Sequence, residues 1–159
     1  MNIAKALKEW RNSRGLTIEM RREGYWCNIQ EKLLEAESST TNVELVETIC
    51  DMAVLTLNCI DNYNLESLIY PVKDDSGYNF YEDVTFILET DFEKAEIMTF
   101  ISHLNHYTNA MGYDFIECLK ETIKEISSRK VEYDLNTKKW VINITGNEYK
   151  ADYTKCIKK

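Results

Sequence analysis

The chain has few residues that interrupt helices, because its 159 residues include one proline and five glycines. Helix interiors tolerate neither residue well, so their scarcity predicts long uninterrupted helices. No apolar run is long enough to span a bilayer, and the first ten residues lack the apolar centre of a secretion signal. We therefore expect a soluble, cytoplasmic protein without a membrane partner.

The cysteine and histidine patterns of metal-binding domains are also missing. The five cysteines are scattered and never form a Cys-x-x-Cys pair, which is typical of free thiols in a reducing compartment. His103 and His106 lie three residues apart on an expected helix and could share a metal ion. Two histidines without a nearby carboxylate or thiol pattern are more often ordinary surface or packed residues, so we do not expect a zinc site.

Positive charge is scarce, since 19 Lys and Arg residues stand against 27 Asp and Glu residues, for a net charge of −8. Nucleic acids and anionic membranes attract positively charged surfaces. Neither is therefore expected as the main partner. An anionic substrate would need a cation to bridge it to this surface.

The most informative segment that is present spans residues 43–60, which would be apolar on nearly every side of a helix. A helix that is apolar all round is a buried helix. Glu47 and Asp51 nevertheless lie one turn apart on one narrow strip of it, together with Asn58. Buried carboxylates are costly unless they are paired, protonated or bound to a metal. The pair therefore requires a cation or a basic partner.

The hydrophobic content of 44% is sufficient for one core, and nothing divides the chain, so we expect a single all-α domain over residues 1–159. Residues 16–25 read as a charged connector, and residues 62–89 are the least regular part. Residues 131–159 are expected to form a short C-terminal arm or hairpin, in which residues 139–144 alternate weakly as one strand. Periodicity and helix-end signals predict about five helices, over residues 2–13, 26–38, 42–61, about 94–111 and about 115–129.

Helix ends carry recognisable signals. The segments Thr41 to Glu44 and Thr90 to Glu93 both read as capping boxes that start a helix. Gly112 is placed to end the fourth expected helix in a left-handed conformation, and Asp114 to cap the last one. Because the link between residues 26–38 and 42–61 is short, these two helices should form an antiparallel hairpin.

That hairpin would gather carboxylates. Glu31 and Glu35 are one turn apart, and antiparallel packing would bring them toward Glu47 and Asp51. Four carboxylates repel one another unless they hold cations, and hard oxygen ligands of this kind are typical of a Mg²⁺ or Mn²⁺ site. In the alternative interpretation, Glu31 and Glu35 belong to a solvated face, while Glu44 and Glu47 complement the helix dipole.

Several segments together resemble one family. They are Glu9-Trp10 with Arg14 to Thr17, Glu31 to Ala36 (EKLLEA), Val43 to Leu57 (VELVETICDMAVLTL), Gly112-Tyr113-Asp114 and Glu121 to Lys130 (ETIKEISSRK). On these residues the chain resembles the MazG-like, all-α nucleoside triphosphate pyrophosphohydrolases, a superfamily that includes dimeric dUTPases and phosphoribosyl-ATP pyrophosphohydrolases. The tail from Lys139 to Tyr153 looks like the C-terminal arm of phage-type members.

The resemblance implies a helical bundle that hydrolyses a nucleoside or deoxynucleoside triphosphate to the monophosphate and pyrophosphate. It implies Mg²⁺, with Mn²⁺ as an alternative, held by Glu31, Glu35, Glu47 and Asp51. Glu35 or Glu47 would act as general base. It further implies a homodimer or tetramer, in which a neighbouring subunit completes a shallow groove.

Two positions depart from the family pattern. The family's first motif usually has a doubled Glu followed by another three residues on, whereas Glu31 and Glu35 are four apart. Thr48 stands where the second motif usually has a Glu, although Asp51 matches that motif's terminal Asp. Either a rearranged metal shell or reduced catalytic power would follow.

Candidate substrate contacts come from two further places. Lys124, Arg129 and Lys130 lie at or near the end of the last expected helix, where they could clamp the leaving pyrophosphate or complement the helix dipole. Asn58 could bind the base or ribose, or could be a satisfied buried amide. A different class of function is also open, namely a non-catalytic acidic module for interaction or regulation.

Overall fold

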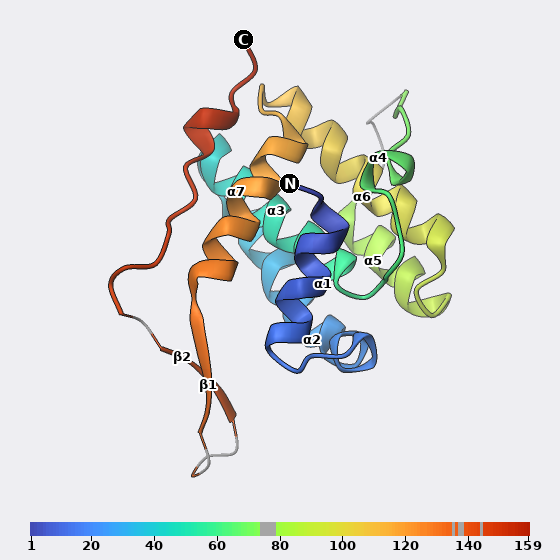
Figure 1. Ribbon diagram of the computed structural model, residues 1–159. Helices are drawn as coiled ribbons and strands as arrows, with labels where there is room; N and C mark the ends of the chain where they lie inside the picture. Colours follow the sequence, from blue (N-terminus) through green and yellow to red (C-terminus); the bar gives the residue numbers. More distant parts are fainter. Residues whose placement is uncertain (74–78, 135, 137–138, 144) are drawn as a thin grey trace.

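The apolar segment identified in the sequence forms helix α3 (Asn42–Leu57), which runs through the middle of a bundle of helices (Figure 1). Most of its residues are buried, and it packs against four helices, α1 (Ile3–Ser13), α2 (Ile18–Ser38), α6 (Lys94–Ala110) and α7 (Phe115–Ser128). The structure is a computed structural model that describes residues 1–73, 79–134, 136, 139–143 and 145–159. A central helix apolar on most sides is the physical reason why the other helices gather around it.

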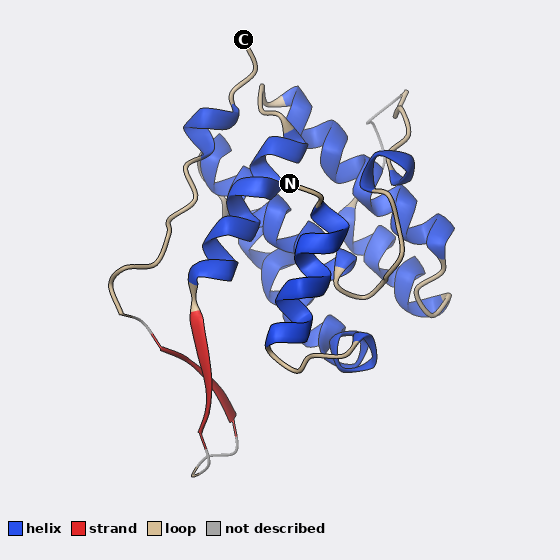
Figure 2. Cartoon of the chain, viewed as in Figure 1, coloured by secondary structure: helices blue, strands red, loops and turns tan. Residues whose placement is uncertain are grey.

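Seven helices occur in the described ranges, so the all-α expectation is confirmed (Figure 2). Residues 62–89, expected to be the least regular part, contain two of them. Besides α3 they are α1 (Ile3–Ser13), α2 (Ile18–Ser38), α4 (Leu65–Leu68), α5 (Phe80–Glu89), α6 (Lys94–Ala110) and α7 (Phe115–Ser128).

Helix α2 begins eight residues earlier than predicted, so the interpretation of residues 16–25 as a connector is wrong. Thr17 caps the helix, with its Oγ1 accepting a hydrogen bond from the Met20 N–H at 3.2 Å. The charged residues that suggested a connector include Arg21 and Arg22, which are half-buried, while Tyr25 packs into the core and its hydroxyl lies 2.8 Å from Thr56 Oγ1. Local charge therefore concealed a helix that is stabilised by one buried stripe.

The capping predictions had mixed outcomes. Thr41 caps α3, with its Oγ1 accepting from the Glu44 N–H at 3.2 Å, and Gly112 adopts a φ of 89°, as expected. The box at 90–93 is wrong, because Thr90 instead ends α5 and its hydroxyl donates to the Phe86 carbonyl at 2.8 Å. Glu93 then starts α6 without a side-chain cap.

Helix α3 ends at Leu57 rather than at residue 61. Asn58 forms its C-cap, with a backbone N–H directed at the carbonyls of Val54 and Thr56. Asn62 soon afterwards has a φ of 54°, which a helix cannot accommodate. The last predicted turn is therefore replaced by a bend that leaves Asn58 at the very end of the helix.

Helix α7 starts as predicted, with the Asp114 carboxylate accepting from the Glu117 N–H at 3.1 Å. Its far end is capped by α1, because Arg14 Nη2 donates to the carbonyls of Ile126 and Arg129 at 3.2 Å and 2.8 Å. Both residues lie near the terminus where orphan helix carbonyls require donors. This contact fixes the N-terminal helix against one end of α7.

Beyond α7 the chain forms an antiparallel pair of strands, β1 (Lys130–Asp134) and β2 (Lys139–Asn143), which projects from the bundle (Figure 1). The strand expected over 139–144 is confirmed for residues 139–143, and residue 144 lies outside the described residues. The chain then returns along α7 to a short 3₁₀ helix, η1 (Tyr153–Cys156). Tyr153 Oη lies 2.9 Å from Thr122 Oγ1 at this junction.

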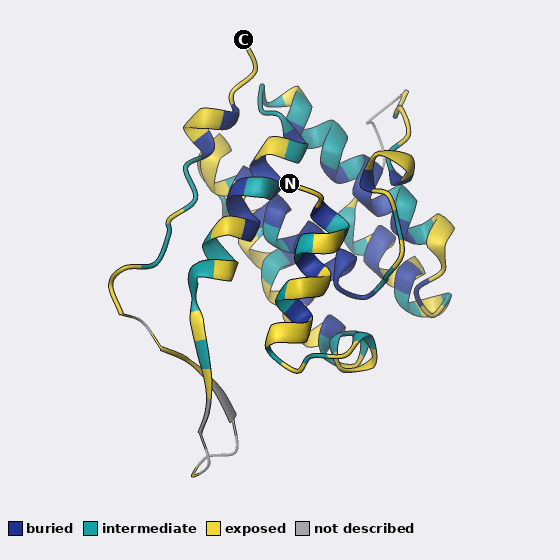
Figure 3. Ribbon diagram, in the orientation of Figure 1, coloured by how far each residue is buried: buried dark blue, intermediate teal, exposed yellow. Residues whose placement is uncertain are grey.

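The core is concentrated around α3, and the outer sides of α1 and α2 are exposed (Figure 3). All five cysteines are free, as expected, and only Cys27 is exposed. Among the described residues, no helix combines the length and apolar character that crossing a membrane requires.

Candidate functional site

Two adjoining cavities lie along α2 and α3, and the second of them also reaches α1, α7 and β2. The first, which we call the carboxylate cavity, has a volume of about 430 Å³, and its lining includes Lys32, Glu35, Glu47 and Asp51. The second, the arginine cavity, has a volume of about 420 Å³. Lys32 and Asp51 line both, so the two cavities adjoin at this pair, and we call them together the groove. The arginine cavity is lined by Trp10, Arg21, Asn28, Glu31, Lys32, Asp51, Val54, Leu55, Asn58, Ile126, Arg129 and Ile142.

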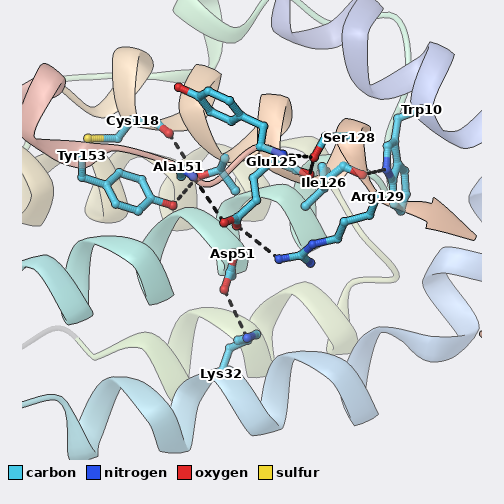
Figure 4. A network of polar contacts seen from close by, with 12 residues as sticks. Trp10, Lys32, Asp51, Cys118, Glu125, Ile126, Ser128, Arg129, Ala151 and Tyr153 are labelled. Carbon is cyan, nitrogen blue, oxygen red and sulfur yellow. Dashed lines mark hydrogen bonds and ion pairs between the residues drawn. The ribbon is translucent and has the colours of Figure 1, made fainter. Parts of the chain in front are cut away.

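Asp51 and Lys32 form the ion pair at the centre of this groove (Figure 4). Lys32 Nζ lies 3.1 Å from Asp51 Oδ2 and 3.2 Å from Glu35 Oε2. The side chains of Lys32 and Asp51 are each 27% exposed. The hairpin of α2 and α3 thus brings the predicted carboxylates together, but a lysine of the same hairpin lies among them.

The carboxylates carry more negative charge than Lys32 neutralises. Burial raises the pKa of Asp51, Lys32 opposes this, and the charges of Glu125 and Glu35 raise it further, so that the net shift is upward. Burial likewise raises the pKa of Glu47, followed by the charges of Asp51 and Glu125. For Lys32, burial lowers the pKa, but attraction to Asp51 and Glu35 outweighs it. Burial is the largest cause for both carboxylates, and an additional cation would relieve the repulsion that adds to it.

Glu125 of α7 is a member of this cluster that the sequence did not reveal. Its carboxylate accepts from the Ala151 N–H at 3.3 Å and lies 3.3 Å from Arg129 Nη2, and it faces Asp51 (Figure 4). Only the spacing of Glu125 and Arg129, four residues apart on one helix, is visible in the sequence. Which face of α7 meets α3 depends on tertiary packing, so no local sequence pattern identifies Glu125 as part of the cluster.

The predicted metal ligands are distributed over both cavities. Glu35, Glu47 and Asp51 line the carboxylate cavity, whereas Glu31 lines the arginine cavity with Asp51. Within the described part of the chain, no three His, Cys, Asp or Glu side chains are arranged to hold a metal ion. The donors themselves are hard carboxylate oxygens, which suit Mg²⁺ or Mn²⁺. Metal binding would therefore require side-chain rotation, with Lys32 leaving Asp51.

The predicted substrate residues divide in the same way. Arg129 and Asn58 line the arginine cavity, and Asn58 is fully buried. Lys124 lines neither cavity, because its Nζ lies 2.9 Å from Glu121 Oε2 on another side of α7. Lys130 is exposed at the start of β1 and also lines neither cavity. Arg21, which the sequence did not single out, lines the arginine cavity instead.

His103 has a packing role. Its Nδ1 lies 2.6 Å from Oδ2 of the buried Asp83, which joins α6 to α5. Asp83 is thereby supplied with a partner that a buried carboxylate requires.

Comparison with models of protein families, with curated proteins and with solved structures finds no match for this chain. The family resemblance read from the sequence therefore stays a prediction. What the groove can do chemically follows from its own residues.

Proposed function

We propose that this protein hydrolyses a nucleoside triphosphate to the monophosphate and pyrophosphate in a Mg²⁺-dependent reaction. The observation that carries the proposal is the convergence of Glu35, Glu47 and Asp51 on the carboxylate cavity, with Glu125 of α7 close enough to raise the pKa of both Asp51 and Glu47 further. Polyphosphates are bound by carboxylate-rich proteins through divalent cations. The resemblance of α2 and α3 to the family's metal-binding helices supports the same reaction.

Each carboxylate is assigned a role in the proposed reaction from its position. Asp51, Glu35 and Glu125 would hold Mg²⁺, which would supply charge neutralisation of phosphate oxygens and a lowered pKa for the attacking water. Glu125 approaches from α7 and offers a carboxylate that Thr48 does not. A glutamate outside the metal shell would accept the proton of the water, and the raised pKa of Glu47 makes it the better base.

We further propose that the protein works as a homodimer or tetramer in the cytoplasm. Helix α2 packs mainly on α3, which leaves its outer side open. Trp26 and Leu34 on that side are 43% and 54% exposed. Exposed large apolar side chains on one helix are typical of a surface that binds another subunit.

One observation favours a second candidate, a non-catalytic acidic module for interaction or regulation. Lys32 already occupies the position between Asp51 and Glu35 that a cation would take. A protein that had lost metal binding would retain this internal ion pair and its acidic surface.

The two candidates respond differently to Mg²⁺. An enzyme should be stabilised by Mg²⁺ together with a non-hydrolysable nucleoside triphosphate, through mass action on the folded state, and should release pyrophosphate from at least one triphosphate. A Glu47→Gln variant should lose turnover and keep its fold. Absence of pyrophosphate release from all common triphosphates, with no Mg²⁺-dependent shift in melting, would favour the module.

A further inference from the structure

Two hydrogen-bond donors at one end of the arginine cavity lack an acceptor. Asn58 is 0% exposed, and its Nδ2 has no hydrogen-bond partner among the described residues. Arg21 Nε is also buried without a partner in the same part of the chain. Both residues line the arginine cavity. Buried donors without acceptors are costly, so two of them beside one cavity indicate a ligand.

The orientation of the Asn58 amide is fixed. Its Oδ1 accepts from Arg11 Nη1 at 3.0 Å. A guanidinium has no acceptor, so exchanging the amide oxygen and nitrogen would place two donors against each other. Arg11 is held in turn by Asp61, at 3.6 Å. Nδ2 therefore faces away from Arg11, and a group that satisfies it must be an acceptor.

Arg21 adds a charge to this requirement. Across residues 1–73, 79–134, 136, 139–143 and 145–159 it forms no ion pair. Its guanidinium stacks on Trp10, 5.6 Å from the ring centroid, and Arg14 lies 4.9 Å from the same ring. Arg14 differs because it is directed at the carbonyls at the end of α7. The end of the cavity near Arg21 thus carries positive charge without a counter-charge, which favours an anion over a neutral carbonyl.

The location suits a polyphosphate chain. Asn58 follows Asp51 by seven residues, or two helical turns, which places the two about 10 Å apart along α3 and on the same face. The arginine cavity connects them. A phosphate chain whose first phosphorus reacts near Asp51 can extend along this face toward Arg21.

We propose that Asn58 and Arg21 form an oxyanion subsite that binds the terminal phosphates of the substrate and the pyrophosphate product. The identification of the anion as part of a nucleotide rests on the proposed function, whereas the oxyanion chemistry of the subsite does not. Arg21 thereby takes the role that the sequence suggested for Lys124 and Lys130, which line neither cavity.

The test is binding of inorganic pyrophosphate to the full chain without Mg²⁺, measured by calorimetry. Arg21→Gln removes the charge, and Asn58→Asp keeps the acceptor for Arg11 but removes the donor and adds a negative charge. Each should weaken pyrophosphate binding about 10- to 100-fold, as expected for a lost charge-assisted hydrogen bond. Lys5→Gln, at an exposed site on α1, makes the same charge change as Arg21→Gln and should bind like the parent.

A melting measurement guards against loss of folding in the variants. Asn58→Asp should melt at or above the parent temperature without ligand, since its carboxylate would pair with the positive charge already present. No pyrophosphate binding to the parent, or equal weakening by Lys5→Gln, would overturn the subsite. Binding of uridine that both variants abolish, without pyrophosphate binding, would overturn it in favour of a base carbonyl.

Failure of the subsite and failure of the proposed function can be told apart. Pyrophosphate binding that depends on Arg21, without hydrolysis of any triphosphate, would retain the subsite and reject the enzyme. Hydrolysis with Mg²⁺ that Arg21→Gln leaves unchanged would retain the enzyme and reject the subsite.

Discussion

The substitution Asp51→Asn distinguishes a metal-binding carboxylate from a simple partner of Lys32. Breaking a fully buried ion pair costs about 3–5 kcal/mol, and breaking an exposed one about 0–1 kcal/mol. The Lys32 and Asp51 side chains are each 27% exposed, so we place the loss near 2 kcal/mol, between these limits.

Neutralising Asp51 also has a favourable effect. Burial raises the pKa of Asp51 most, and repulsion from the charges of Glu125 and Glu35 raises it further. Removing that repulsion should offset about 1 kcal/mol, the scale of the interaction between two unit charges a few ångströms apart in water. The metal-free variant should therefore lose about 1 kcal/mol of unfolding free energy, which is about 2–4 °C in melting temperature for a chain of this size.

The assay compares melting with and without Mg²⁺ and a non-hydrolysable nucleotide, together with pyrophosphate release. Asp51→Asn should lose the Mg²⁺-dependent rise in melting temperature, and its turnover should fall by orders of magnitude. Asp61→Asn is the matched control for stability, because Asp61 pairs with Lys8 and Arg11, its side chain is 28% exposed, and it lines neither cavity. The control should retain the Mg²⁺ response.

A loss of about 3 kcal/mol or more in metal-free Asp51→Asn, as for a buried pair that has been broken, would contradict this reasoning if the Mg²⁺ response stayed intact. Asp51 would then be a structural partner of Lys32 and nothing more.

Three further predictions concern the scaffold. Although burial raises the pKa of Glu121, hydrogen bonds from Tyr149, Lys124 and the Asp152 N–H lower it to about 2, so its carboxylate stabilises the fold above pH 4.5 and ceases to do so as pH falls toward 2. Melting of Glu121→Gln should show a deficit of about 1–2 kcal/mol at pH 7 that shrinks over this acid range, and a constant deficit would contradict the assignment. His103→Ala should lower the free energy of unfolding by about 3 kcal/mol in a denaturant titration, because it removes the imidazole that contacts the buried Asp83 carboxylate. A loss below about 1 kcal/mol, the value for exposed pairs, would show that the fold does not depend on this pair. Light scattering at micromolar protein concentration should give a molar mass at least twice the 18.7 kDa of one chain. Trp26→Glu should lower this mass, and a monomeric mass for the parent protein would count against the proposed assembly.

Helix positions could be predicted from the sequence wherever a clear apolar pattern or a helix-capping residue was present. The all-round apolar character of residues 43–60 correctly placed α3 at the centre, and the caps at Thr41 and Asp114 fixed two helix starts. Residues 16–25 were misread because a run of charged residues resembles a loop, whereas the burial of Tyr25 and the half-buried positions of Arg21 and Arg22 depend on tertiary packing. The role of Thr90 could not be decided from the sequence, because a threonine hydroxyl can bond to backbone groups at the end of one helix or at the start of the next.

The groove was less predictable than the helices. Glu35, Glu47 and Asp51 could be grouped because they share one hairpin, whose geometry is local. Glu125 lies on α7 and Arg21 on α2, and the sides on which they face the groove depend on how these helices pack, which periodicity does not encode. Lys32 lies on the same strip as the glutamates, but its ion pair with Asp51 forms only when the two helices of the hairpin pack together.

Pyrophosphate release from a panel of ribo- and deoxyribonucleoside triphosphates, with Mg²⁺ and with a chelator, tests the proposed hydrolysis most directly. We predict release of pyrophosphate with the matching monophosphate from at least one triphosphate, dependent on Mg²⁺ and lost in Asp51→Asn. Release of inorganic phosphate instead, or no product from any triphosphate at saturating Mg²⁺, would contradict the proposed reaction.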